Sequence, residues 1–150
     1  MFEWKWMTNE EAMAIVQWEY DGEEAFYNID DGSDDIDEFL NPFNWNHYIA
    51  IYESGELIGY CIFLPKDVIV GMQLVLRPDL IGQGRGESLI AYVMNIAKER
   101  YEPKKLTFHI PKFNKRALKA TEKLGFKRTI TSIVQKQDHQ VPLIKMEYDF

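Results

Sequence analysis

The pattern of apolar and polar positions predicts a chain in which strands alternate with helices. Residues 68–76 form an apolar run rich in Val and Leu, which is typical of a buried strand. Residues 2–6 alternate aromatic and charged side chains with the period of two that a strand shows. Farther along, apolar residues recur at steps of three and four, as on one face of a helix, at Leu89, Val93, Ile96 and Ala97.

Capping and turn residues predict the elements of the first half of the chain. Thr8 and Glu11 form a capping box, so a helix is expected to begin there and to end near residues 20–22. Two short helical pieces are expected, one over residues 23–29 and one toward Leu40 that is capped by Ser33 or Asp34. Further strands are predicted over residues 45–52 and 57–64, joined by a hairpin turn, and over residues 106–110, 127–136 and 143–150.

A second long helix is expected after Asn114, with Gly125 as its C-cap. Its buried face is predicted to consist of Phe113, Ala117, Ala120, Thr121 and Leu124. The resulting order is one strand, helical pieces, three strands, a helix, a strand, a helix and two strands. That order predicts an α/β (α+β) fold, a mixed sheet flanked by helices, in a single domain over residues 1–150.

A glycine-rich turn, Gly82-Gln83-Gly84-Arg85-Gly86, lies between the apolar strand and the following helix. The N–H groups of a helix's first turn have no partner within the helix, and the helix dipole adds positive potential there. Glycines lack the Cβ atoms that would keep an anion away, and Arg85 adds a cation. The turn therefore predicts a site for a phosphate or a diphosphate.

Three other interpretations of this turn were compared with the spacing of its glycines. A P-loop requires Gly, four residues, Gly and Lys followed by Ser or Thr, and the sequence contains no such run. A dinucleotide site requires G-x-G-x-x-G, and here the third glycine comes one residue early. The turn could also simply end a strand, but three alternating glycines before an amphipathic helix favour a binding role.

The spacing resembles the coenzyme A-binding segment of the GCN5-related N-acetyltransferase (GNAT) superfamily, whose pattern is Gln or Arg, two residues, Gly, one residue, and Gly or Ala. Gly84 and Gly86 take the glycine positions, Gly82 is a frequent extra glycine, and Leu89 takes an apolar helix position. The first position of the pattern is Ile81 instead of Gln or Arg. Backbone amides do most of the phosphate binding in this pattern, so the resemblance survives the change.

A second motif of the same superfamily follows in the expected order. The family pattern is Asn, two residues, Ala, three residues, often Tyr, and a short run that ends in Gly-Phe. Asn114, Ala117, Leu124 and the pair Gly125-Phe126 fit this pattern. Thr121 stands where many members carry the tyrosine that protonates the departing thiolate.

The resemblance implies a GNAT-like, mostly antiparallel sheet of about seven strands, whose fourth and fifth strands splay apart to form a notch for acetyl-CoA. It implies that backbone groups of Leu74, Val75 and Leu76 bind the acetyl group and the pantetheine arm. It assigns the diphosphate to Gly82, Gln83, Gly84, Arg85, Gly86 and Glu87, and it assigns a contact with the pantetheine arm to Asn114. The cosubstrate is then acetyl-CoA, with no metal.

The catalytic acid and base are left unassigned by the sequence. Thr121 and Glu147 are weak candidates: a threonine hydroxyl is a poor acid, and Glu147 lies on the last predicted strand. His47 and His109 lie on segments predicted to be strands, where hydrogen-bonded structural histidines are the more common case. A chain of water molecules that accepts the amine's proton is at least as good a candidate as any side chain.

The acceptor was predicted from an acidic stretch, residues 30–38, and from the aromatic residues around it. The acidic stretch is either a solvated loop, which is favoured, or an electronegative lip over an acceptor site. Aromatic faces attract cationic amines. Trp18, Tyr20 and Tyr27 are hypothetical acceptor contacts from the surrounding aromatic set, which consists of Trp18, Tyr20, Phe26, Tyr27, Phe43, Trp45 and Tyr48.

The composition adds limits on location and partners. The net charge of −7 disfavours DNA and suits a cationic acceptor such as an amine. The single cysteine, Cys61, is interpreted as a buried small apolar residue. Residues 1–10 lack the apolar core of a signal peptide, and no run approaches the length of a membrane span, so we expect a cytoplasmic protein without a membrane partner. A homodimer is expected from the resemblance alone.

The predicted function is acetyl-CoA-dependent N-acetyltransfer to a primary amine. The first alternative is a non-catalytic module of the same fold that binds or senses acyl-CoA, since the family's tyrosine and a carboxylate on the central strand are both absent. The second is a dinucleotide-binding domain. The glycine spacing and the lack of a repeated βαβ unit disfavour that alternative.

Overall fold

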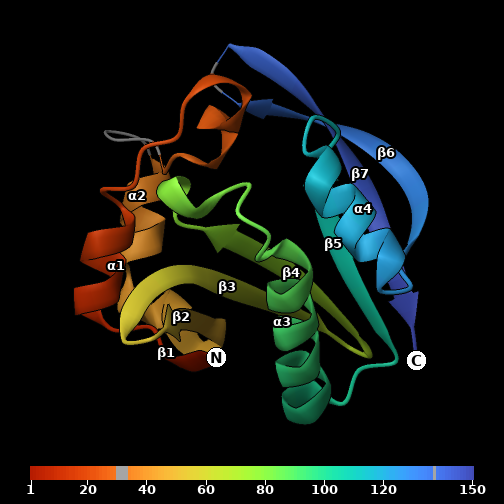
Figure 1. The fold of residues 1–150 in the computed structure, drawn as a ribbon, viewed down its shortest axis with the longest axis horizontal. Coiled ribbons are helices and arrows are strands. Elements are labelled where there is room, and N and C mark those ends of the chain that lie inside the picture. Colours follow the sequence, from red (N-terminus) through yellow and green to blue (C-terminus); the bar gives the residue numbers. More distant parts are fainter. Residues whose placement is uncertain (30–33, 137) are drawn as a thin grey trace. The chain divides into compact units, whose positions relative to one another are not determined.

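Seven strands of the described residues, 1–29, 34–136 and 138–150 of the computed structural model, form one open mixed sheet in the order β1-β2-β3-β4-β5-β7-β6, with helices flanking it (Figure 1). This is the fold class that the sequence predicted. The described chain divides into two compact units. The N-terminal unit comprises Met1–Ile62 and Leu74–Ile81, and the C-terminal unit comprises Phe63–Gln73 and Gly82–Phe150.

The N-terminal unit contains three paired strands and two α-helices. Its elements are β1 (Phe2–Trp6), α1 (Asn9–Ile15), the 3₁₀ helix η1 (Gly22–Tyr27), α2 (Asp34–Leu40), the 3₁₀ helix η2 (Pro42–His47), β2 (Tyr48–Glu53), the first part of β3 (Glu56–Lys66), the end of β4 (Ile69–Leu76) and the 3₁₀ helix η3 (Pro78–Leu80). β2 pairs antiparallel with β1 and with β3. Ser54 and Gly55 join β2 to β3 with positive φ angles of 52° and 82°, as a tight hairpin turn requires.

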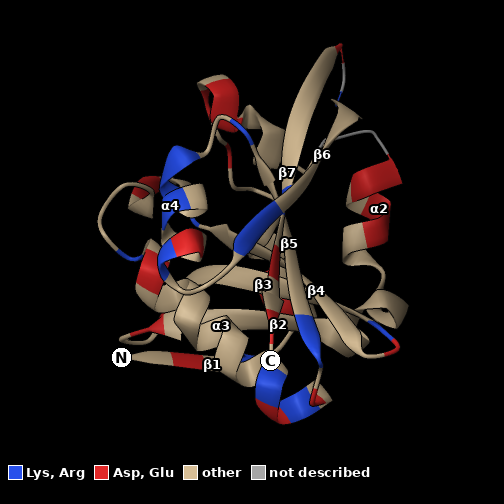
Figure 2. Ribbon diagram, turned by 90° about the vertical axis from the view of Figure 1, so that its right-hand side faces the viewer, with Lys and Arg blue, Asp and Glu red and all other residues tan. Residues whose placement is uncertain are grey.

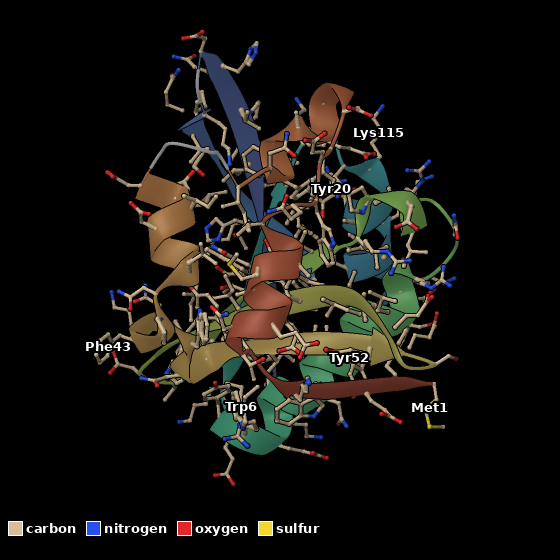
Figure 3. The ribbon with its side chains drawn as sticks, turned by 90° about the vertical axis from the view of Figure 1, so that its left-hand side faces the viewer. Met1, Trp6, Tyr20, Phe43, Tyr52 and Lys115 are labelled. Atoms are coloured by element: carbon tan, nitrogen blue, oxygen red, sulfur yellow. The ribbon has the colours of Figure 1, made fainter. Side chains whose placement is uncertain are left out.

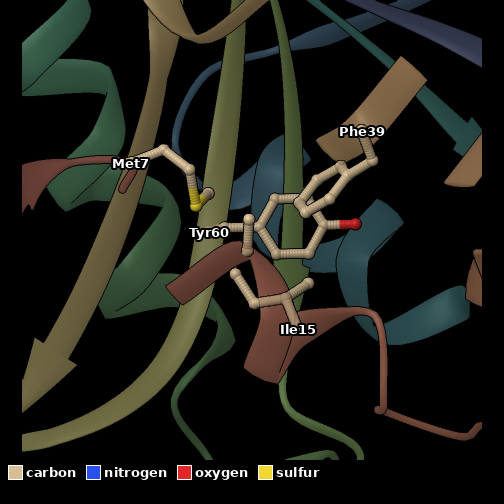
Figure 4. Close-up of a cluster of buried hydrophobic side chains, with 5 residues drawn as sticks. Met7, Ile15, Phe39 and Tyr60 are labelled. Atoms are coloured by element: carbon tan, nitrogen blue, oxygen red, sulfur yellow. The ribbon is translucent and has the colours of Figure 1, made fainter. Parts of the chain in front are cut away.

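A cluster of buried side chains holds α1 and α2 onto the strands of this unit. Met7, Ile15, Phe39 and Tyr60 converge in its centre (Figure 4). The rings of Phe39 and Tyr60 meet edge to face with their centroids 5.3 Å apart. The cluster explains why the short helices α1 and α2 are stable, because helices of this length depend on packing rather than on propensity.

The C-terminal unit contains the end of β3 and the start of β4, followed by α3 (Gly86–Tyr101), β5 (Lys105–Pro111), α4 (Lys115–Lys123), β6 (Lys127–Lys136) and β7 (His139–Asp149). β4 pairs parallel with β5, with Ile69 opposite Lys105 and Met72 opposite Phe108. β7 pairs antiparallel with both β5 and β6. The parallel pair is connected through α3, as a parallel crossover requires.

The packing of α3 and α4 confirms the predicted helix faces in part. Leu89, Val93, Ile96 and Ala97 of α3 are buried, as their spacing predicted. On α4, Leu118 is buried together with Thr121, although the sequence analysis had not placed Leu118 on the inner face. Beyond α4, the ring of Phe126 packs against those of Phe108 and Tyr148.

Several predicted boundaries were wrong, and each has a local cause. α1 ends at Ile15 and not near residues 20–22, because the N–H groups of Gln17 and Trp18 bond to carbonyls three residues back and tighten the last turn. Residues 45–47 belong to the 3₁₀ helix η2 instead of β2. Most of residues 23–29 form a 3₁₀ helix. The predicted cap Ser33 lies outside the described residues.

The last strand also begins earlier than predicted. β7 starts at His139, four residues before the expected Leu143, and it includes Pro142. The register with β5 ends at Leu143, so Pro142 lies where β7 pairs with β6. A proline inside a strand is tolerated where its missing N–H faces away from a neighbouring strand.

Candidate functional site

The glycine-rich turn has the backbone conformation of an anion-binding turn. Gly82 and Gly84 have φ angles of +80° and +84°, and Arg85, the N-cap of α3, follows in the right-handed conformation. A left-handed residue followed by a right-handed one turns successive N–H groups toward the same side. The first i to i−4 bond of α3 joins the N–H of Leu89 to the carbonyl of Arg85 at 2.9 Å. The N–H groups of residues 86–88 thus come before the first i to i−4 hydrogen bond of the helix.

The space around the glycines fits an approaching ligand. A Cβ atom built on Gly84 or on Gly86 meets no atom of the protein within 4 Å. Gly86 has no positive φ, so neither its conformation nor its packing requires a glycine there. The open side of Gly86 leaves room for a ligand to approach the backbone, which is the property that a diphosphate site needs, and its predicted role in binding stays a prediction.

Arg116 of α4 is a cation at this turn that the sequence analysis missed. A Cβ built on Gly82 lies 3.3 Å from Cζ and from Nη2 of Arg116, so the guanidinium group lies against Gly82. Within the turn, Nη1 of Arg85 donates to Oε1 of Gln83 at 3.2 Å. Glu87 pairs with Lys123 at 3.4 Å, which partly neutralises the one carboxylate in the first turn of α3.

Asn114 has a structural role in the described chain. Its Oδ1 accepts a hydrogen bond from the N–H of Ala117 at 3.2 Å, which makes Asn114 the N-cap of α4. The same cap fixes the start of α4, the helix that carries Arg116. The predicted contact with the pantetheine arm remains a prediction.

The end of β4, in the N-terminal unit, is held by hydrogen bonds to Leu76 and to the next residue, Arg77. Leu74, Val75 and Leu76 are half-buried. The hydroxyl of Tyr20 donates to the carbonyl of Leu76 at 2.7 Å, and the N–H of Arg77 donates to the carbonyl of Ile58 at 2.7 Å. The predicted binding of acetyl and pantetheine groups by these residues is neither tested nor contradicted by this arrangement.

The three aromatic residues predicted to contact the acceptor all lie in the N-terminal unit, and two of them, Tyr20 and Tyr27, pack against each other. Trp18 packs against the ring of Tyr60 at 6.2 Å, and the rings of Tyr20 and Tyr27 lie 5.9 Å apart. Tyr20 is only 5% exposed, whereas Tyr27 and Trp18 are both half-buried. The burial of Tyr20 favours a role in holding β4 over direct contact with an acceptor. The roles of Trp18 and Tyr27 stay predictions.

Thr121 is poorly placed to act as an acid. It is completely buried, and its hydroxyl donates to the carbonyls of Ala117 and Leu118 at 2.9 and 3.0 Å. This hydroxyl satisfies carbonyls within its own helix. The structure thus favours a packing role for Thr121 in α4.

The other polar candidates have shifted pKa values that limit their use as bases. Hydrogen bonding from Lys105 at 2.8 Å lowers the pKa of Glu147, and Lys145 contributes in the same direction. A carboxylate with a lowered pKa is a weaker base. Desolvation lowers the pKa of His109, with a smaller effect from Lys145 on the facing position of β7. His47 lies at the end of η2 and not on a strand.

Charge is distributed unevenly between the two halves of the sequence. Residues 1–81 carry 17 acidic and 3 basic side chains, a net charge of −14, whereas residues 82–150 carry 7 acidic and 14 basic side chains, a net charge of +7. Exposed Lys and Arg residues gather on α4, and acidic residues gather on α2 (Figure 2). Lys115, at the start of α4, is exposed (Figure 3).

The described residues contain neither a membrane-spanning helix nor a cluster of metal ligands. None of the helices in residues 1–29, 34–136 and 138–150 combines the length and apolar character that a membrane span needs. The same residues hold no group of three or more His, Cys, Asp and Glu side chains arranged to bind a metal ion.

Comparison with known proteins identifies related chains. Residues 3–126 match the model of the acetyltransferase (GNAT) family. A Bacillus subtilis protein, provisionally named a ribosomal protein bS18-alanine N-acetyltransferase, is 29% identical over 86 residues, which cover 57% of this chain. The match spans about half, 55%, of the length of that relative.

Solved structures share the fold at low sequence identity. A Vibrio cholerae spermidine N-acetyltransferase in complex with CoA and spermine superposes with a TM-score of 0.81 at 14% identity, covering 99% of this chain and 95% of that one. The aminoglycoside acetyltransferase AAC(6')-Ib in complex with coenzyme A gives a TM-score of 0.76 at 19% identity, with the same coverage of both chains.

Proposed function

The chain belongs to the acetyltransferase (GNAT) family, and we propose that it is an N-acetyltransferase that transfers the acetyl group of acetyl-CoA to a primary amine. When bound, acetyl-CoA supplies the acetyl group as an activated thioester. A bond forms between the amine nitrogen and the acetyl carbon, and the carbon–sulfur bond breaks. The proton that the amine loses balances the proton that the thiolate of coenzyme A takes up.

The observation that carries the proposal is the geometry of the turn before α3. Residues 82–86 combine two glycines with positive φ, open space at Gly84 and Gly86, and the N–H groups at the start of a sixteen-residue helix. Backbone amides at a helix N-terminus bind phosphate groups through hydrogen bonds and the helix dipole. Arg85 and Arg116 add two cations, which suits the diphosphate of coenzyme A.

The acetyl-binding residues follow from the family resemblance. We propose that backbone groups of Leu74, Val75 and Leu76 bind the acetyl and pantetheine groups, and that a backbone N–H near Leu76 holds the carbonyl oxygen as negative charge develops on it. Only five residues, 77–81, separate this segment from the glycine turn along the chain. Orientation of the two reactants is the main contribution to the rate, about 7 kcal/mol or more in well-oriented systems.

The acceptor is proposed to be a cationic small molecule or peptide. The charge of −14 on residues 1–81 attracts cations toward the N-terminal unit. Tyr27, which lies in η1 with Glu23 and Glu24, and Trp18 offer aromatic faces that favour ammonium groups. Solved relatives act on polyamines and aminoglycosides, which are cations of this class.

The experiment that tests this proposal measures release of the coenzyme A thiol with a panel of amines that includes polyamines, aminoglycosides, amino acids and peptides. Thiol release that depends on one class of amine, with the acetylated amine as product, is the expected result. Binding of acetyl-CoA without turnover of any amine would instead favour the alternative, a non-catalytic acyl-CoA-binding module. That alternative gains support from the buried, internally bonded hydroxyl of Thr121 in place of an acid.

A further inference from the structure

We propose that Tyr20 is a positioning residue for acetyl transfer, which fixes the backbone at the end of β4 through a hydrogen bond to Leu76. This inference rests on the proposed function, because it concerns the strand end that would hold the acetyl group. All of the contacts that carry it lie within the N-terminal unit.

The peptide group between Leu76 and Arg77 is held at both of its polar atoms. Its carbonyl oxygen, on Leu76, accepts from the hydroxyl of Tyr20 at 2.7 Å. Its N–H, on Arg77, donates to the carbonyl of Ile58 in β3 at 2.7 Å. A peptide plane that is bonded on opposite edges cannot rotate without breaking one of the two bonds, so its orientation is fixed.

The preceding peptide is fixed by close packing. A Cβ atom built on Gly59 would lie 2.7 Å from the carbonyl oxygen of Val75, a distance that real Cβ atoms do not reach. Glycine at position 59 therefore lets the backbone of β3 approach the end of β4. Nη1 of Arg77 adds a hydrogen bond to the carbonyl of Leu57 at 2.9 Å, so the neighbouring residues of β3 hold this segment from one side.

Tyr20 is itself held in place, so it can hold the carbonyl side of the Leu76–Arg77 peptide group firmly. Its N–H donates to Oδ1 of Asn28 at 2.7 Å, and its carbonyl accepts from Nδ2 of Asn28 at 3.2 Å. Its ring packs against that of Tyr27. Burial raises the pKa of the Tyr20 hydroxyl, so the group remains a proton donor throughout the working range of pH.

These contacts matter for catalysis because acetyl transfer needs donors that do not reorient as charge develops. A backbone N–H stabilises a developing oxyanion only if it already points at it, and a shift of about 1 Å costs about a hundredfold in rate. Tyr20 is then an indirect contributor that holds the strand, in place of the acceptor contact that the sequence suggested.

The test compares Tyr20→Phe with Tyr48→Phe. Both variants remove one tyrosine hydroxyl from the N-terminal unit. The ring of Tyr48 packs on Phe39, whereas the hydroxyl that donates to the carbonyl of Leu76 is that of Tyr20. We expect Tyr20→Phe to lower kcat about 10- to 100-fold, while the dissociation constant for coenzyme A, whose diphosphate is proposed to bind at residues 82–86, rises by a much smaller factor. Tyr48→Phe should leave both values near those of the wild type. Gly59→Ala, which pushes on the same strand end from β3, should also lower kcat more than it weakens coenzyme A binding.

The outcomes separate this inference from the proposed function. If the wild-type protein binds no coenzyme A thioester or acetylates no amine, the proposed function fails and the inference fails with it. If the wild type is active and Tyr20→Phe retains its kcat, only the positioning role is overturned. If Tyr20→Phe weakens coenzyme A binding as much as it lowers kcat, the hydroxyl of Tyr20 supports the fold as a whole, and the positioning role is overturned.

Discussion

At the scale of single residues, Gly84 has a backbone conformation that favours glycine and an open side where a ligand could bind. Substitutions at Gly84 and at a control glycine can separate these two properties. The φ of Gly84, +84°, is costly for any residue with a Cβ, by about 1–2 kcal/mol, and its open side is where a diphosphate would bind. Gly55 in the β2–β3 turn has nearly the same φ, 82°, and equally open surroundings.

We expect Gly84→Leu to weaken coenzyme A binding at least tenfold, while Gly55→Leu leaves it unchanged. Both variants should lose similar amounts of stability, because the backbone strain is the same. Isothermal calorimetry and thermal unfolding of the two variants measure these effects. Undiminished affinity in Gly84→Leu would show that the turn does not bind the cosubstrate.

Arg116 provides a second test at the same turn. Its guanidinium group lies against Gly82 and is exposed, so we expect Arg116→Ala to weaken coenzyme A binding about fivefold, the effect of roughly 1 kcal/mol. The salt dependence of binding should also fall. Lys98→Ala, which removes an exposed lysine from the last turn of α3, is the control. Equal affinities of the two variants would exclude a phosphate contact by Arg116.

Thr121 should prove unimportant for the chemical step. Because its hydroxyl donates to two carbonyls of its own helix, Thr121→Ala is expected to lower kcat by less than about a hundredfold, the lower end of a general acid's contribution. Thr129→Ala, on exposed β6, controls for the loss of a threonine. A greater loss in kcat, without loss of stability, would make Thr121 a catalytic residue.

The sequence predicted individual residues well only where one local pattern determines them. The capping box of Thr8 and Glu11, the turn at Gly55 and the stripe from Leu89 to Ala97 are patterns of this kind. Arg116 carried no such signal, because its approach to Gly82 depends on how α4 packs beside α3. The Tyr20–Leu76 bond joins residues 56 positions apart, and no local pattern could have predicted it.

At the scale of elements, a buried carboxylate ties α1 to β1 and β2. Glu11 is 2% exposed, and it accepts hydrogen bonds from Lys5 at 2.8 Å, from Tyr52 at 2.6 Å and from the hydroxyl and N–H of Thr8 (Tyr52 is labelled in Figure 3). Burial alone would raise the pKa of Glu11, but these donors outweigh it and lower the pKa from 4.5 to about 2. A fully bonded buried carboxylate of this kind stabilises the ionised form.

The lowered pKa predicts how stability depends on pH. The contribution of Glu11 should be complete above pH 4.5 and should be lost as pH falls from there toward 2, because the unfolded state takes up the proton first. The shift in the pKa of Glu11 corresponds to a contribution of at most about 3 kcal/mol to the free energy of unfolding. Because Lys5 is exposed to solvent, the actual contribution is smaller. Urea unfolding of Glu11→Gln at pH 7 and pH 3 measures it, with exposed Glu10→Gln as the control. A destabilisation of Glu11→Gln that is as large at pH 3 as at pH 7 would contradict this assignment.

Element order was predicted correctly, whereas element ends were not. Periodicity and turn residues specify which segments are strands and which are helices, and all seven strands of the described chain were expected. The end of α1 depends on the tightened last turn at Gln17 and Trp18, and the start of β7 depends on its pairing with β6, neither of which periodicity contains. The described chain divides into two compact units. The prediction of a single domain stays a prediction.

At the scale of the whole molecule, the opposite charges of the two halves of the sequence predict opposite electrostatic preferences. Residues 1–81, at −14, should attract a cationic acceptor, and residues 82–150, at +7, should attract the phosphates of coenzyme A. We expect the KM for a polyamine to rise steeply with salt, since exposed charges are screened beyond about 10 Å at 0.1 M. The KM for a monoamine, which carries a single positive charge and an uncharged alkyl chain, should rise much less. Steady-state kinetics at two ionic strengths measure the difference, and equal salt effects on both acceptors would contradict an electrostatic acceptor site.

The central claim is that the turn at residues 82–86 binds the diphosphate of a coenzyme A thioester. The most direct measurement is calorimetric titration of the protein with acetyl-CoA and, separately, with NAD. The account predicts a saturable heat at one site and a higher melting temperature with acetyl-CoA, and neither effect with NAD. An absence of heat and of stabilisation with acetyl-CoA, or equal binding of NAD, would contradict it.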